Sequence, residues 1–93
     1  MKDDVVNGQR IRCYDDGKSG DRYTVVYLDC PERAINVFEA VAMSEAPFHP
    51  QGCGQHCAAS LGRHLGKRIR FSDLPADCQR LINNDTKQEG VKS

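Results

Sequence analysis

Two segments in the first half of the chain have apolar patterns that are typical of β-strands. Residues 10–14 place Ile11 and Cys13 on one face, and residues 22–28 contain the β-branched and aromatic run Tyr-Thr-Val-Val-Tyr-Leu. Residues of these types favour strands, and the acidic, glycine-containing stretch between the two segments favours a loop. We therefore expect a hairpin here, preceded by a frayed segment over residues 1–8.

The next apolar pattern, over residues 35–43, fits two structures. Strand geometry would place on one face Ile35, Val37, Val41 and Met43, with Glu39 interrupting them. A helix beginning at Pro31 would instead form an apolar stripe from Ala34, Phe38, Val41 and Ala42. The alternation favours a third strand. Residues 67–71 predict a further short strand or extended segment.

Two later segments show the spacing of a helix. Residues 55–65 carry apolar side chains at Ala58, Leu61 and Leu65, and Gly66 follows as a stop. A second helix is expected to start from residues 72–75, with Pro75 in its first turn, and to end at residues 83–85. Its buried stripe is formed by Leu74, Cys78, Leu81 and Ile82. The predicted fold is a small α+β domain, in which an antiparallel sheet of three to four strands packs with two short helices.

Length and composition predict one intracellular domain. The chain has 93 residues, 39% hydrophobic and 28% charged, which is typical of a single globular unit over residues 1–93. We expect an ordered core over about residues 10–85 and a flexible tail over residues 86–93. Neither a membrane-spanning apolar run nor the apolar segment of a signal peptide is recognisable. Five cysteines in a reducing cytoplasm do not predict a disulfide framework.

All three histidines and two cysteines fall between residues 49 and 66. Thiolate and imidazole groups are the ligands that zinc prefers, and Cys53 and His56 have a spacing that one turn of backbone can bring to a single ion. The predicted Zn²⁺ ligands are His49, Cys53, His56 and Cys57, with Asp21, Cys30 and Cys13 as substitutes from elsewhere in the chain. A zinc ion would stabilise so short a domain. The alternative is purely structural, because free cysteines are often buried as small apolar residues.

His64 is excluded from this set by the predicted helix. Eight residues separate it from His56, which is roughly 12 Å along a helix axis. Two ligand bonds of about 2.0–2.3 Å do not span that distance on one ion.

Charge is divided between the halves of the chain, although the formal net charge is zero. Residues 1–46 contain six Lys and Arg against nine Asp and Glu, and residues 47–93 contain seven against four. The basic residues Arg63, Lys67, Arg68 and Arg70 are dense enough to contact phosphates, but a nucleic-acid-binding protein normally has a larger excess. A solvated surface is the simpler interpretation.

Catalysis is less well supported than binding. Cys57 near His49 or His56 would form a cysteine–histidine pair, and Glu45 or Asp21 would serve as the base of a zinc hydrolase. Neither arrangement has a recognisable motif around it. We expect a protein that is not an enzyme, with a small zinc-dependent nucleic-acid-binding module and a metal- or cysteine-dependent hydrolase as alternatives.

Several stretches together resemble a family of small, mostly uncharacterised proteins of bacteriophages and prophages. They are Asp-Arg-Tyr-Thr-Val-Val-Tyr (21–27), Met-Ser (43–44), Pro-Phe-His-Pro-Gln-Gly (47–52), His-Leu-Gly-Lys-Arg-Ile (64–69) and Leu-Pro-Ala-Asp-Cys-Gln (74–79). The resemblance implies a phage accessory role in the cytoplasm of an infected bacterium. It also implies an anti-CRISPR protein, which would bind a host CRISPR nuclease of the Cas9 type and block the loading of target DNA.

An acidic surface is the natural complement of the basic channel of a nuclease. We therefore expect the partner-binding residues to include Asp15, Asp16 and Asp21.

Overall fold

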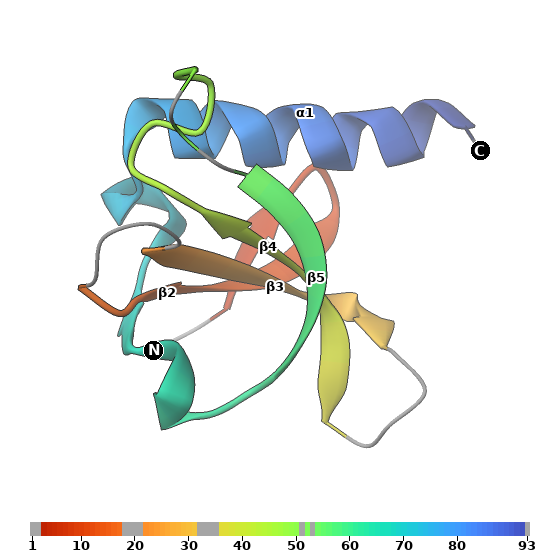
Figure 1. Cartoon of the computed structure of the whole chain (residues 1–93). Helices are drawn as coiled ribbons and strands as arrows, with labels where there is room; N and C mark the ends of the chain where they lie inside the picture. The colour runs from red at the N-terminus through yellow and green to blue at the C-terminus, as the bar shows by residue number, and fades with distance from the viewer. Residues whose placement is uncertain (1–2, 18–21, 32–35, 51, 53, 93) are drawn as a thin grey trace.

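A curved antiparallel sheet with one long helix across it forms the fold of the computed structural model, which describes residues 3–17, 22–31, 36–50, 52 and 54–92 (Figure 1). The strands are β1 (Asp4–Val6), β2 (Gln9–Asp15), β3 (Tyr23–Pro31), β4 (Val37–Met43), β5 (Gly54–Ser60) and β6 (Lys67–Ile69). Their order is β1-β2-β3-β4-β5. β6 also pairs with β2, beyond the part of β2 that pairs with β1.

The predicted architecture of three to four strands and two short helices is wrong. The described part of the chain contains six strands, two 3₁₀ turns and a single α-helix, α1 (Ala76–Lys92). The strands predicted over residues 10–14, 22–28, 35–43 and 67–71 are confirmed as β2, β3, β4 and β6, with shifted ends. The helix alternative for residues 35–43 is thereby rejected. The zinc stabilisation included in that prediction is not supported either, because no group of three or more metal-ligating side chains gathers among the residues described.

The first helix expected from the sequence is instead a strand followed by a turn. β5 pairs with β4 over seven residues, and the 3₁₀ turn η1 (Arg63–Leu65) comes after it. An isolated helix of about eleven residues is marginal, so the hydrogen bonds offered by the free edge of β4 outweigh its weak local preference. Leu61 and Leu65 still find apolar surroundings, because they pack against the sheet on the face opposite α1.

The strand β1 replaces the frayed segment expected over residues 1–8. Asn7 and Gly8 both have positive φ, 50° and 84°, and they connect β1 to β2 in a two-residue turn. The dipeptide Asn-Gly is a strong signal for such a hairpin.

The core is divided between the two faces of the sheet. The larger cluster lies under α1 and includes Ile11, Val25, Val41, Met43, Cys78 and Ile82. The smaller cluster on the other face is formed by Tyr14, Val26 and Ala40 with Leu28, Phe38, Ala59, Leu61 and Leu65 at its margin. The chain after β5 therefore covers the second face, and both faces of β2 and β3 are buried.

The helix α1 begins where the sequence predicts but ends later. Leu74, Cys78 and Ile82 are buried as expected, and Leu81 is half-buried. Thr86 continues the same stripe, is 3% exposed, and accepts a hydrogen bond from the Asn7 side chain at 2.9 Å. This contact with the β1–β2 turn places residue 86 inside the packed helix, beyond the polar residues 83–85 that predicted its end. In the part of the chain described, no helix is both long and apolar enough to cross a membrane.

Candidate functional site

Among the residues that the structure describes, the predicted zinc ligands are not brought together. His56 and Cys57 are neighbours in β5, and successive side chains of a strand point to opposite faces. His56 lies on the α1 side beside Val41, whereas Cys57 lies on the other side beside Ala40. His49 is exposed in the turn before β5, and Cys53 and Asp21 are outside the described residues. The residues that the structure describes therefore do not fit this zinc set, and we derive no chemistry from it.

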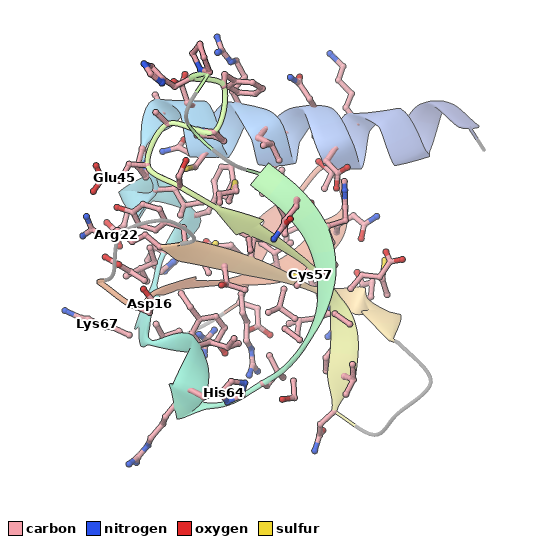
Figure 2. All side chains as sticks on the ribbon, viewed as in Figure 1. Asp16, Arg22, Glu45, Cys57, His64 and Lys67 are labelled. Atoms are coloured by element: carbon pink, nitrogen blue, oxygen red, sulfur yellow. The ribbon has the colours of Figure 1, made fainter. Side chains whose placement is uncertain are left out.

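Within the part of the chain that the structure describes, Cys57 and His56 do not form the cysteine–histidine pair considered from the sequence. Cys57 is exposed on β5 (Figure 2). Its neighbour His56 lies on the opposite face of the sheet, because successive strand residues alternate between faces. Cys13 and Cys78 are buried, and burial raises the pKa of these thiols to about 12 and about 11 respectively. Cys30, a substitute ligand in the sequence prediction, is half-buried and contacts the Gln9 side chain at 3.7 Å.

The acidic residues expected to bind a partner are engaged within the fold. Asp15 accepts two hydrogen bonds from Arg22, at 2.8 and 3.1 Å, and a third from the backbone N–H of Gly17. The hydrogen bonds from Arg22 hold the pKa of Asp15 below its ordinary value. Figure 2 shows Arg22 beside Glu45, which it also bonds, and Asp16 close by is half-buried. Asp21 lies outside the described part of the chain.

Half of the basic run, Arg68 and Arg70, is engaged within the fold in the same way. Arg68 pairs with Asp3 at 2.7 Å, and Arg70 pairs with Asp4 at 2.8 Å. Lys67 and Arg63 are exposed at the ends of β6 and η1. The two halves of opposite charge are therefore joined to each other inside the molecule, which reduces the charge available for an external partner.

The outer edge of β5 is the surface that these contacts leave open. Across the described residues β5 pairs only with β4, so alternate residues along it direct their N–H and C=O groups away from the sheet. Five of its seven residues, 54–58, are exposed. The strand Gly-Gln-His-Cys-Ala-Ala-Ser contains no Lys, Arg, Asp, Glu or Pro, which are residues that normally discourage pairing with another chain.

A shallow groove of about 190 Å³ lies between the beginning of β5 and α1. Its apolar wall is formed by Val41, Phe48 and Leu81. Gly54 forms part of the wall, and a Cβ atom there would lie 2.8 Å from the Leu81 side chain. Phe48, one of the two large apolar residues exposed in the described chain, stacks on Arg80 with 4.6 Å between guanidinium carbon and ring centre.

A polar group borders the same groove. The His56 Nε2 atom is 2.9 Å from one carboxylate oxygen of Asp85, and the Tyr27 hydroxyl donates to the other at 2.6 Å. These bonds connect β5, α1 and β3, so they hold the edge strand at a fixed distance from the helix. The groove thus presents an apolar recess with fixed polar groups beside an unpaired strand.

Sequence reasoning singled out residues 47–66 but predicted a helix over residues 55–65, where the structure has the strand β5. The signal available for an edge strand is an uncharged run of mostly small residues, including Ala58 and Ala59, that follows the better predicted strand β4 in the chain. The partner Asp85 carries no sequence signal, since it lies 29 positions from His56.

Comparison of the chain with protein-family models, with curated proteins and with solved structures gave no match. The resemblance to phage proteins accordingly stays a prediction.

Proposed function

We propose that this protein is a non-catalytic binding protein that takes an extended segment of a partner protein as a new strand on β5. The observation that carries the proposal is the seven-residue edge of β5, which is exposed over residues 54–58 and contains no Lys, Arg, Asp, Glu or Pro to oppose pairing. In strand addition, main-chain hydrogen bonds supply affinity and pockets for alternate side chains supply specificity. The groove lined by Phe48 and Leu81 is such a pocket.

The partner segment follows from this geometry. It is extended, contains β-branched residues, and carries one apolar side chain that enters the groove at Gly54. Because Asp15 is already engaged by Arg22, the interaction does not depend on the acidic loop. We propose a host protein as the partner, and the phage resemblance makes a CRISPR effector nuclease the first candidate to test for inhibition of DNA loading.

The test is a selection of displayed peptides on the immobilised chain, followed by hydrogen exchange of the complex. Two substitutions, Cys57→Pro and Ala58→Pro, provide the critical comparison. Consecutive strand residues direct their N–H groups to opposite edges, so one proline removes a bond to β4 and the other removes only an outward N–H. The variant that keeps its stability is the probe for the outer edge.

We expect selected peptides to protect the β5 amides from exchange and to lose binding to that stable proline variant. A matched control is Val5→Pro in β1, at the other edge of the sheet, used where the variant remains folded. The proposal is wrong if peptides bind the stable β5 variant as well as they bind the unaltered protein. Protection that maps to another surface would contradict it equally.

A further inference from the structure

A second pocket, of about 420 Å³, opens on the opposite side of the sheet from the groove beside α1. It is lined by side chains from β2, from the chain after β5, and from β6, including Arg12, Tyr14, Leu61, Arg63 and Arg68. The volume falls in the range of about 300–1,000 Å³ that is typical of small-molecule sites. Three arginine side chains therefore border one open surface pocket.

Positive charge exceeds negative charge around this pocket. Asp3 is the carboxylate that bonds the lining arginines, and it accepts from Arg12 at 2.6 Å and from Arg68 at 2.7 Å. One carboxylate neutralises one of these two guanidinium groups. Arg63 forms no ion pair with any residue that the structure describes. The three arginines and Asp3 together carry a net charge of about +2, since arginine stays protonated.

The guanidinium groups also have donors to spare. Each has five N–H donors, and the Nε–H of Arg68 is buried without an acceptor in the described part of the molecule. The Asp15 backbone lies close to Gly66 at the rim of the pocket. Its carboxylate does not serve as an acceptor for Arg68, because it is bonded to Arg22. The matching ligand group is a dianion with several acceptor oxygens, and the planar fork of arginine suits phosphate in particular.

We infer that this pocket binds a phosphomonoester of small-molecule size, with its phosphate among Arg12, Arg63 and Arg68. The volume is larger than a phosphate ion requires, and Tyr14 and Leu61 form an apolar wall for the remainder of the ligand. A nucleoside monophosphate has both parts. This site is independent of strand addition on β5, since it lies on other residues and on the other face of the sheet.

The experiment is a titration of the labelled protein, followed by NMR, with AMP, inorganic phosphate, adenosine and a short single-stranded oligonucleotide. We expect AMP to bind more tightly than adenosine, and added salt to weaken the binding. Arg63→Gln should weaken AMP binding about tenfold or more, because it removes a charged donor. Arg63 is exposed, so this substitution leaves the fold intact. Arg10→Gln, at an exposed arginine paired with Asp29, is the matched control and should bind as the unaltered protein does.

Three results would overturn the inference. Equal affinity for AMP and adenosine would exclude a phosphate site, and unchanged binding in Arg63→Gln would place the phosphate elsewhere. Affinity that rises steadily with oligonucleotide length would identify a nucleic-acid surface in place of a small-molecule pocket. Shifted resonances confined to Tyr14, Leu61 and the three arginines would support it.

Discussion

The two edges of the sheet are built in opposite ways. At one edge, two strands of only three residues each, β1 and β6, share the length of β2. Charged residues join them, because Asp4 in β1 bonds Arg70 just after β6 and also the backbone N–H of Phe71. At the other edge, none of the seven residues of β5 is Asp, Glu, Lys or Arg.

This difference supports the proposal that a partner strand would add to the β5 edge and not to the edge formed by β1 and β6. Short strands with charged side chains are a common way to prevent pairing with another chain. A long strand of small, uncharged residues does not provide that protection. Substitutions in the edge formed by β1 and β6 should therefore mainly lower the free energy of unfolding. Substitutions in the edge formed by β5 should mainly weaken binding of the proposed partner.

The largest loss of stability is expected at Gly66, which leads into β6. Its φ is +105°, and a Cβ atom there would lie 2.4 Å from the Asp16 Cα atom and 2.6 Å from the Asp15 carbonyl oxygen. Gly66→Ala should lower the free energy of unfolding by about 3 kcal/mol or more, from backbone strain and from the clash together. Chemical denaturation measures this loss.

Gly17→Ala separates the two causes. Gly17 also has positive φ, +74°, but a Cβ atom there would meet nothing within 4 Å. The alanine should cost only about 1 kcal/mol, from the conformation alone. Equal losses of stability in the two variants would show that Gly66, just before β6, is not in tight contact with the loop after β2.

The next loss is expected from Asp4→Asn, which removes the charge that joins β1 to β6. The Asp4 carboxylate accepts from the Arg70 guanidinium at 2.8 Å and from the Phe71 N–H at 2.8 Å, and its side chain is 16% exposed. We expect the free energy of unfolding to fall by about 1 to 2 kcal/mol, because Arg70 is half exposed and water partly replaces the bond. Asp29→Asn, in the exposed pair with Arg10, is the control and should cost less. The opposite ranking would argue against a closed edge.

The same carboxylates predict how stability depends on pH. The bond from Arg12 holds the pKa of Asp3 below its ordinary value of 3.8. For Asp4, burial acts to raise the pKa, but the bonds from Arg70 and Phe71 outweigh it and leave the pKa lowered. A lowered folded-state pKa contributes stability above pH 3.8 that disappears as pH falls through the folded-state value. The denaturant concentration at the midpoint of unfolding should therefore decrease as the pH is lowered below about 4, and it should decrease less steeply in Asp4→Asn.

The sequence predicted the strands whose pattern of apolar residues can be recognised from the strand's own residues. Ile11 and Cys13 in β2, and Val25 and Tyr27 in β3, alternate with the correct period and are buried. The stripe of Leu74, Cys78 and Ile82 located α1 for the same reason. These residues bury one face of a regular element, and local spacing is enough to identify that face.

The edge strands β1 and β5 were not predicted in this way, whereas β6 was expected over residues 67–71. β5 has small side chains and few buried residues, so its strand conformation depends on pairing with β4, which lies elsewhere in the chain. The Asn7-Gly8 turn did carry a local signal, and sequence reasoning overlooked it. The contacts of the candidate sites, such as His56 with Asp85 and Asp3 with Arg68, join residues 29 and 65 positions apart. No local pattern encodes such a pair.

A smaller effect on stability is expected where β5 is tied to the helix. Tyr27→Phe removes the 2.6 Å bond between the buried Tyr27 and Asp85 and should lower the free energy of unfolding by about 1 kcal/mol. His56→Ala removes the other contact of Asp85, but the His56 side chain is 69% exposed, so it should cost less. Denaturation of both variants provides the comparison. A larger loss in His56→Ala would mean that β5 contributes more to folding than its exposure indicates.

The smallest effect is expected at the centre of the open edge. Ala58 in β5 is paired directly with Glu39 in β4, and both residues are exposed. Oppositely charged residues placed across two strands stabilise a sheet by about 0.2–1 kcal/mol, and like charges destabilise it by a similar amount. Ala58→Lys should therefore keep or slightly raise the free energy of unfolding, and Ala58→Glu should slightly lower it. The difference between the two variants, measured by denaturation at low and at high salt, should shrink as salt screens the charges. A loss above about 1 kcal/mol in both would show that β5 tolerates no larger side chain, and the outer edge would then be part of the folded core and not an open surface.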